Sequence, residues 1–149
     1  TDGADAVVFN ALVKAVDKEG AVYEVVAPKI GGVTLSDGTA VPAKQKIDGG
    51  PSVLFDAIAV VASEEGAALL AMDAAAKDFV TDAFAHCKYI GLTAEAQALF
   101  EKAGIADDLD EACLPLATAK DARSFLTACR ALRYWSRELT VDLDAQPDA

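Results

Sequence analysis

Segments with helical periodicity alternate along this chain with short runs of strand-forming residues, and this alternation limits the fold more than any other feature. In the first helical segment, Phe9, Leu12 and Val16 recur at the spacing of one buried helical face. Residues 56–61 are nearly continuously apolar, which is typical of a strand covered on both faces. This alternation predicts an α/β fold with a largely parallel sheet and helices on both of its faces.

The boundaries of the expected elements follow from capping residues and turn residues. We expect helices between the caps Asp5 and Gly20, over 66–86 with a break near Met72 and Asp73, over 95–103, and over 120–136. We expect strands over 22–27, 56–61, 89–93 and 112–116, and a hairpin over 33–42 that turns at Asp37 and Gly38.

The beginning of the chain is unusual for this class, because an α/β unit normally opens with a strand. Residues 1–5 have the character of a strand-to-helix loop, and no strand precedes them. We therefore expect the native polypeptide to extend further back; the alternative is a fold that simply starts with a helix. Because bare sheet edges invite aggregation, we expect the adjoining polypeptide to supply the first strand, or other pairing to close the gap.

The charge of the chain excludes two classes of partner. The sequence has 24 acidic and 13 basic residues, a net charge of −11 and a pI near 4.3. Nucleic-acid binding relies on basic residues that displace phosphate counterions, and attachment to an anionic membrane surface needs them as well. We therefore expect neither a nucleic-acid nor a membrane partner.

The cysteines indicate a reducing compartment. Cys87, Cys113 and Cys129 form an odd, widely spaced set, which does not resemble a disulfide framework. His86 is the only histidine, so we do not expect a zinc site. His86 and Cys87 could be a displaced catalytic pair, but we interpret them as a helix C-terminus and the cysteines as small packed hydrophobes. We predict a cytoplasmic location.

The order of the segments resembles the class I glutamine amidotransferase-like superfamily, which includes PfpI-type proteases and related glyoxalases. Thr-Asp-Gly-Ala-Asp at 1–5 is similar to its first loop, and Phe-Asp-Ala-Ile-Ala-Val at 55–60 is similar to its buried strand. Residues 90–105 resemble its nucleophile elbow and the helix that follows. The resemblance implies a flavodoxin-like three-layer sandwich with a mostly parallel sheet, whose first strand is missing from this chain.

Within that superfamily, the closer resemblance is to the C-terminal domain of large-subunit (clade 2) haem catalases. It is carried by the hairpin at 32–42, by Gly-Gly-Pro-Ser at 49–52 and by the closing segment at 131–137. The resemblance implies an α/β domain over 1–137, an acidic tail over 138–149, and a strand of the type Val-x-Ile-Leu-Val before the first loop. It also implies a homotetrameric parent that converts hydrogen peroxide to water and oxygen during oxidative stress.

In such a parent the haem and its ligands lie upstream, so this chain is expected to hold no cofactor or metal. Its partners would be the N-terminal catalase core and the other subunits. The superfamily's enzymes carry a cysteine at the elbow, but that position maps to Ala94, its usual histidine neighbour to Glu95, and the first-loop acid to Asp5. We therefore predict a non-catalytic domain that serves subunit stability, assembly, or a chaperone-like or channel-shaping role.

The same residues leave other functions open. One is a stand-alone PfpI-like hydrolase, glyoxalase or chaperone homologue with a degenerate site, and another is a stand-alone acidic interaction module. A flavodoxin-like electron carrier is disfavoured, because the first loop has two carboxylates where a flavin phosphate would lie.

The arginines cluster near the end of the chain, at positions 123, 130, 133 and 137. The spacing of Arg130, Arg133 and Arg137 would place them on one helical face, and with Arg123 they predict a docking face toward the parent protein or another subunit. Ordinary placement of cations at a helix C-terminus explains the same pattern equally well. The acidic residues at 107–111 lack the spacing of a calcium loop, and we expect them to be solvated.

Overall fold

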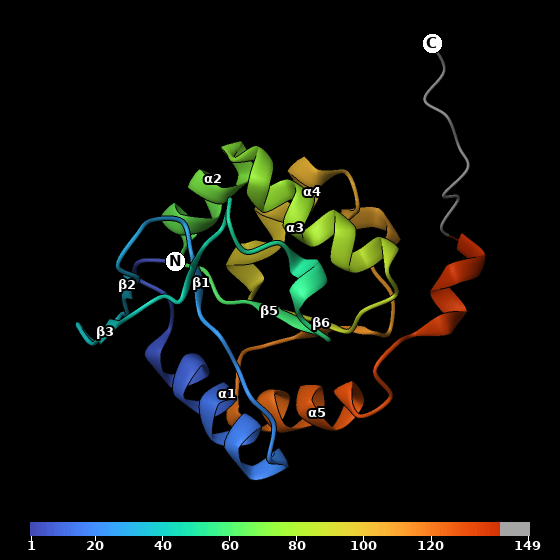
Figure 1. Cartoon of the computed structure of the whole chain (residues 1–149), viewed down its shortest axis with the longest axis horizontal. Coiled ribbons are helices and arrows are strands. Elements are labelled where there is room, and N and C mark those ends of the chain that lie inside the picture. Colours follow the sequence, from blue (N-terminus) through green and yellow to red (C-terminus); the bar gives the residue numbers. More distant parts are fainter. Residues whose placement is uncertain (141–149) are drawn as a thin grey trace.

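The computed structural model describes residues 1–140, which form three layers (Figure 1). Helices α1 and α5 cover one face of the parallel sheet β5–β6–β7, and α2, α3 and α4 cover the other. The helices are α1 (Ala6–Glu19), α2 (Glu64–Met72), α3 (Ala74–Ala85), α4 (Gln97–Ala103) and α5 (Ala119–Cys129). The strands are β1 (Val26–Ala27), β2 (Val33–Thr34), β3 (Ala40–Val41), β4 (Gln45–Lys46), β5 (Ile58–Val60), β6 (Ile90–Leu92) and β7 (Cys113–Pro115).

Capping residues set both ends of α1 and the break between α2 and α3 as the sequence predicts. The Asp5 carboxylate accepts the backbone N–H groups of Val7 and Val8 at 2.8 and 3.1 Å, so α1 begins at the next residue. Gly20 ends α1 in the left-handed region, at φ 68°. Asp73 ends α2 and caps α3, which confirms the predicted break in the helical segment.

Parallel pairing confirms three of the expected strands. Ile58 of β5 lies opposite Ile90 of β6, which lies opposite Cys113 of β7. The predicted hairpin is present as the antiparallel pair β2–β3. Among residues 1–140, β1 pairs only with β4, in a separate two-stranded sheet, so other pairing within these residues does not close the gap in the sheet.

The prediction of a strand over 22–27 is wrong for most of its length. Only Val26 and Ala27 pair with a neighbouring strand, and the Val22 side chain is 98% exposed. The segment has the composition of a strand, but no neighbouring strand lies alongside its first residues, and a ladder needs a partner.

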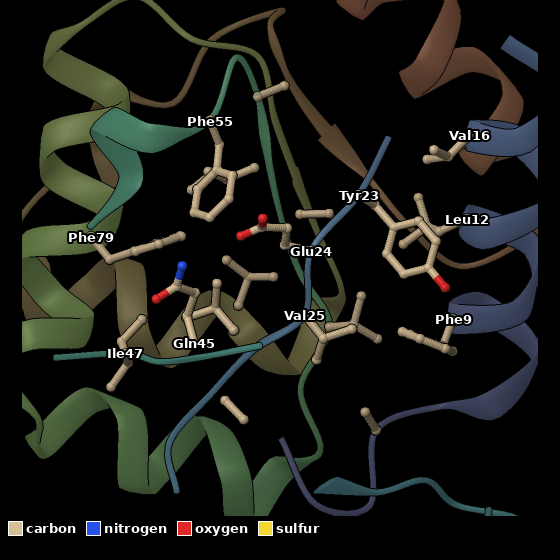
Figure 2. A pocket seen from close by; sticks show the side chains of 18 of the residues that line it. Phe9, Leu12, Val16, Tyr23, Glu24, Val25, Gln45, Ile47, Phe55 and Phe79 are labelled. Carbon is tan, nitrogen blue, oxygen red and sulfur yellow. The ribbon is translucent and has the colours of Figure 1, made fainter. Parts of the chain in front are cut away.

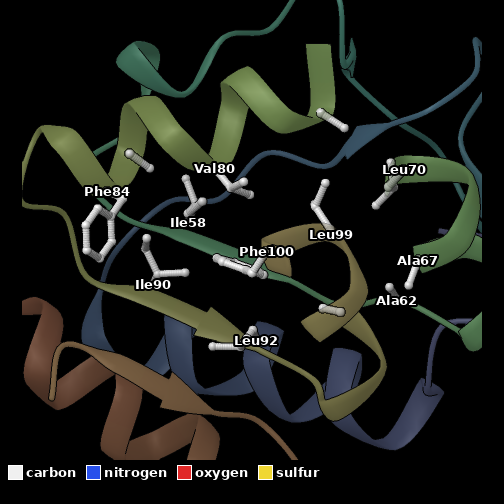
Figure 3. Packing of buried hydrophobic residues seen from close by; sticks show 13 residues of the cluster. Ile58, Ala62, Ala67, Leu70, Val80, Phe84, Ile90, Leu92, Leu99 and Phe100 are labelled. Atoms are coloured by element: carbon white, nitrogen blue, oxygen red, sulfur yellow. The ribbon is translucent and has the colours of Figure 1, made fainter. Parts of the chain in front are cut away.

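Two apolar clusters hold the layers together. Between the sheet and α2–α4, the Phe100 and Val80 side chains are completely buried against Ile90 (Figure 3). On the opposite face, Leu12 of α1 and Phe125 of α5 belong to a second buried cluster. The sheet is therefore covered on both faces, as its apolar strands predict.

The last helix is shorter than the sequence predicts, and the expectation of a helix over 120–136 is wrong beyond Cys129. Leu132 adopts a left-handed conformation with φ 64°, which turns the chain out of the helix. Arg133 then forms an antiparallel bridge with Lys88, before β6. A 3₁₀-helix follows at Trp135–Thr140. Tertiary contacts at the start of β6 therefore override the local helical pattern.

The predicted acidic tail begins inside this last element. Residues 138–140 belong to the 3₁₀-helix, and residues 141–149 of the predicted tail lie outside the described residues. Over residues 1–140, none of the helices combines the length and the apolar character needed to cross a bilayer.

Candidate functional site

The loops at the carboxyl ends of β5 and β6 meet the loop at residues 1–5, where a parallel sheet normally carries its chemistry. Ser63 Oγ donates to the Asp2 carbonyl at 2.6 Å, and the Ser63 N–H donates to Thr1 Oγ1 at 3.0 Å. Thr93 Oγ1 accepts the Ala62 N–H at 3.2 Å. The hydroxyl groups at this edge therefore hold the loops together.

The residues of the predicted elbow lie at this edge of the sheet. Ala94 and Glu95 are exposed and open a 3₁₀ turn directly after β6. The exposed Asp5 carboxylate caps α1 with its Oδ1 atom. Within residues 1–140, no hydrogen bond or ion pair joins Asp5 to Glu95. Ala94 carries no nucleophilic atom, so this edge lacks the thiol that the superfamily's chemistry needs.

The cysteines lie elsewhere in the fold. Cys87 precedes β6 and Cys113 opens β7, both at the amino ends of the strands, while Cys129 ends α5. Burial raises the pKa of the Cys87 and Cys113 thiols, and it raises the pKa of Cys129 to about 12. These thiols are free and stay protonated near neutral pH, so none is an activated nucleophile.

The other candidates for a catalytic pair or a metal site have structural roles. His86 is the C-terminal cap of α3, which confirms the interpretation of this residue as a helix end. Across the described residues, no group of three or more His, Cys, Asp or Glu side chains is placed to hold a metal ion.

The four arginines do not share a helical face, because α5 ends before three of them. Arg123 is exposed on α5, and Arg130 Nε donates to Glu19 at 3.0 Å, joining the ends of α5 and α1. Arg133 Nη1 donates to the Asp56 carbonyl at 3.1 Å. The expectation that Arg130, Arg133 and Arg137 lie on one face is therefore wrong, whereas docking through the exposed members stays a prediction.

Arg137 is instead a buried anchor, which the sequence did not indicate. Its Nε and Nη2 donate to the two carboxylate oxygens of Asp110 at 2.6 and 2.9 Å. Its Nη1 donates to the carbonyls of Phe84 and Lys88 at 3.1 and 2.8 Å, and its guanidinium lies 4.3 Å from the centre of the Phe84 ring. The prediction that residues 107–111 are solvated is therefore wrong for Asp110.

The surroundings of the Arg137–Asp110 pair favour the ionised form of Asp110. Burial alone would raise the pKa of Asp110, but hydrogen bonds from the Arg137 guanidinium and the Ala112 N–H outweigh it and hold that pKa below its ordinary value. The partners are 27 residues apart, and no local pattern in the sequence relates them.

A second buried cation lies beside this anchor. Lys88 is 2% exposed, and its Nζ donates to the Ser52 carbonyl at 2.6 Å. Burial, followed by the nearby Arg133 charge, lowers the pKa of Lys88. The Ser52 hydroxyl has no hydrogen-bond partner, but Ser52 is completely buried and no substrate reaches it. The hydrogen bond from Lys88 to the Ser52 carbonyl therefore holds the turn before β5 against the start of β6.

An apolar groove of about 1040 Å³ lies beside β5 (Figure 2). We call it the β5 groove. Its walls are the open edge of β5 and the extended residues 23–25, with Leu12 and Val16 of α1 on one side and Phe55 on the other. The sequence predicted an incomplete sheet but not that a cavity of this size would lie within it.

Comparison with known proteins shows close relatives of the sequence. Residues 1–138 match the family described as the C-terminal domain found in long catalases. Catalase C of Rhizobium meliloti (strain 1021) is 52% identical over 143 residues, which are 96% of this chain and 20% of that protein. The chain therefore spans about one fifth of the length of this relative.

Solved structures show a similar fold at low sequence identity. Schizosaccharomyces pombe DJ-1 has a TM-score of 0.69 at 13% identity, covering 98% of this chain and 96% of that one. A two-domain protein from Anabaena variabilis with DJ-1/ThiJ/PfpI-like and ferritin-like domains has a TM-score of 0.73 at 12% identity, covering 100% of this chain and 50% of that one. These likenesses confirm the predicted α/β fold class.

Proposed function

The chain belongs to the family of C-terminal domains found in long catalases, and we propose that it is a non-catalytic domain of a haem catalase that converts hydrogen peroxide to water and oxygen. The observation that carries this proposal is the family match over residues 1–138, together with the 52% identity to Catalase C. The protonated thiols and the Ala94 side chain at the elbow support the absence of chemistry at the superfamily's usual site.

Within residues 1–140, the side chains of His86 and Tyr134 do not fit the role of a haem ligand. The exposed His86 ends a surface helix, and the Tyr134 hydroxyl donates to Glu111 at 3.2 Å, so neither is placed as an axial ligand in a buried pocket. In the proposed protein, haem therefore belongs to the upstream polypeptide, and no step of the peroxide reaction passes through the described residues. The free cysteines are in keeping with a cytoplasmic location.

We assign the domain a role in subunit stability and assembly, with the catalase core and neighbouring subunits of a homotetramer as partners. Trp135 is 65% exposed and Leu139 is 93% exposed on the last 3₁₀-helix, and large exposed apolar side chains favour an interface. Arg130 and Arg133 lie just before them and add cations suited to carboxylates on a partner. A chaperone-like role is the second candidate, favoured by the apolar β5 groove.

The natural polypeptide provides the first test. We expect intact-mass measurement to give a chain about five times as long as this one, in proportion to the relatives, and absorbance spectroscopy to show the Soret band of haem. Peroxide added to the whole protein should release oxygen, whereas the 149-residue chain should turn over neither peroxide nor methylglyoxal. A mature protein of 15.4 kDa would overturn the proposal.

Charge reversal at the exposed Arg130 and the half-buried Arg133 tests the assembly role. In the whole protein, Arg130→Glu combined with Arg133→Glu is expected to weaken subunit association about tenfold or more, because cations facing carboxylates become like charges. Light scattering across a dilution series measures the change.

A matched variant separates docking from net charge. Lys102→Glu with Lys120→Glu changes the charge equally at two exposed sites, and it should leave the oligomer mass unchanged. If the arginine variant also keeps its oligomer mass, these residues have no role in docking. Thermal unfolding of the 149-residue variants checks that the chain still folds after the loss of the exposed Arg130–Glu19 pair and of the Arg133 hydrogen bond to the Asp56 carbonyl.

A further inference from the structure

A second groove lies between α1 and α5, which lie side by side on one face of the sheet (Figure 1). We call it the α1–α5 groove. It has a volume of about 340 Å³ and is lined by Ala11, Lys14, Ala15, Lys18, Ala119 and Arg123. The members from α1 are spaced at i, i+3, i+4 and i+7, so they form one face of that helix, and the two members from α5 share a face for the same reason. Each helix therefore provides one wall.

The lining of this groove combines small apolar side chains with long basic ones. Half of the lining residues are alanine, whose side chain ends at Cβ and leaves room that a longer apolar side chain would fill. The other half are the exposed Lys14, Lys18 and Arg123. Leu12 and Phe125 of the same two helices pack into the buried cluster against the sheet. The groove is therefore open to solvent, and a ligand in it would contact methyl groups and three cations.

The three cations of the groove have no carboxylate partner among residues 1–140, where the ion pairs involve other basic residues. Glu19 follows Lys18 on α1, but its carboxylate is bound by Arg130. The Asp121 carboxylate accepts backbone N–H groups at the start of α5. Asp17 of α1 does not line the groove. The positive charge of the groove is therefore not neutralised by the described residues.

This positive charge is opposite in sign to the charge of the whole chain. The chain has a net charge of −11, yet 3 of its 13 basic residues line this groove and no acidic residue does. Like charges four residues apart on a helix repel each other, so Lys14 and Lys18 lower the stability of α1 in the unbound chain. A bound anion would remove this repulsion and would be attracted to both walls. The groove therefore favours an anionic ligand.

The size of the groove and its surroundings favour one kind of anion. A nucleic acid would extend its phosphates beyond the three cations onto a strongly negative surface, which opposes binding. A peptide confines its charge to the groove. In an extended peptide, alternate side chains lie about 7 Å apart on one side, close to the spacing of about 6 Å between Cβ atoms four residues apart on a helix. Carboxylates on alternate residues would therefore meet Lys14 and Lys18, while Arg123 is suited to a further carboxylate through two parallel hydrogen bonds.

We propose that the α1–α5 groove is a docking site for an acidic polypeptide segment from outside this chain, bound in extended form with carboxylates on alternate residues. Lys14 and Lys18 bind the segment from one wall, and Arg123 binds it from the other. This gives Arg123 a partner separate from any that Arg130 and Arg133 contact. The proposal does not depend on the catalase assignment, because it rests on the lining of the groove alone.

An NMR titration with two peptides tests the class of ligand. Acetyl-Ala-Asp-Leu-Asp-Leu-Asp-Ala-amide is compared with the same peptide carrying Asn in place of each Asp. The acidic peptide should shift the amide signals of Ala11, Ala15 and Ala119 with a Kd of about 0.1–1 mM, since exposed ion pairs are individually weak. The Asn peptide should bind about tenfold or more weakly. Equal affinity for the two peptides would refute an acidic ligand.

Charge reversal on both walls tests the site. Lys18→Glu combined with Arg123→Glu should weaken binding of the acidic peptide about tenfold or more. The matched control is Lys44→Glu with Lys102→Glu, which changes the net charge equally at exposed residues outside the groove and should keep the affinity within about twofold. Circular dichroism checks that both variants fold. Equal losses of affinity in the two variants would show non-specific attraction to positive charge and would overturn the assignment to the groove.

Three other occupants have distinct signatures, and each would overturn the assignment. Inorganic phosphate that shifts the same alanine amides and displaces the peptide at equal concentration would show a site for small anions. A concentration-dependent dimer that Lys18→Glu with Arg123→Glu abolishes in sedimentation would show that a second copy occupies the groove. Residues 141–149 include three Asp and no Lys or Arg, and an affinity that rises about tenfold on their removal would show that this segment of the chain competes for the groove.

Discussion

Replacing Arg137 with leucine is expected to lower the free energy of unfolding of this chain by about 3–5 kcal/mol. The guanidinium is completely buried, and its loss leaves the Asp110 carboxylate, which is 23% exposed, without its cation. The carbonyls of Phe84 and Lys88 lose a donor at the same time. Leucine supplies apolar volume but no hydrogen bonds, so burial of the unpaired carboxylate dominates the cost.

Urea denaturation followed by circular dichroism measures this loss. The free energy of unfolding of Arg137→Lys should lie between those of the wild type and Arg137→Leu, because an ammonium keeps the charge but not the two parallel bonds to Asp110. Arg123→Leu changes an exposed arginine on α5 and should alter stability by no more than about 0.5 kcal/mol. If Arg137→Leu lowers the free energy of unfolding as little as Arg123→Leu does, the pairing of Arg137 with Asp110 contributes nothing to stability.

The same pair predicts a pH dependence with a definite sign. The pKa of Asp110 is lower in the folded chain than its ordinary value, so the folded state favours the carboxylate. The stabilisation is fully present above the unfolded pKa, about 3.9, and is lost as the pH falls through the lower folded value. The stability difference between the wild type and Arg137→Leu should therefore narrow below about pH 4.

Gly32→Ala is expected to cost about 3 kcal/mol, the second largest effect. Gly32 has φ 105°, where an L-residue is strained, and a Cβ there would overlap the Val41 carbonyl oxygen and lie 2.7 Å from the Ala43 nitrogen. Both neighbours are backbone atoms of the β3 side of the hairpin, so neither can rotate away. The hairpin would have to open, exposing the buried Val33 side chain.

The adjacent glycine is the matched control. Gly31 also has a positive φ, 95°, but a Cβ there meets nothing within 4 Å. Gly31→Ala should therefore cost only the conformational strain, about 1–2 kcal/mol. Differential scanning calorimetry of the two variants separates the cost of the steric overlap at Gly32 from the cost of conformational strain that both positions share. Equal melting temperatures would show that the close approach to Val41 relaxes freely.

Local signals in the sequence predict most of the elements of this fold. Asp5 and Gly20 mark the ends of α1, and Asp73 marks the break between α2 and α3, because each acts on backbone groups within a few residues of itself. The apolar runs at β5, β6 and β7 indicate strands buried on both faces. The segment that resembles a nucleophile elbow contains β6 and the 3₁₀ turn that begins at Ala94, and the assignment of Ala94 to the nucleophile position stays a prediction.

The features that the sequence did not predict depend on distant partners. Residues 130–136 keep a helical pattern, but pairing with Lys88 and the buried Arg137 draw them out of the helix. The strand-like residues 22–25 have no strand beside them, so composition alone misleads there. The pairing of Arg137 with Asp110 joins segments 27 residues apart, and no spacing rule relates them.

The loop at residues 1–5 is hydrogen-bonded both to the segment 22–50 and to the residues that follow β5. Within residues 1–140, the hydrogen bonds that leave the segment 22–50 reach only residues 2–6, through contacts such as Gly3 N–H to the Thr34 carbonyl. The same loop is bonded to Val61 and Ser63. Hydrogen bonds therefore connect the segment 22–50 to the β5–β6–β7 sheet only by way of this loop, and opening of the segment 22–50 as a separate cooperative unit need not break the β5–β6–β7 ladder.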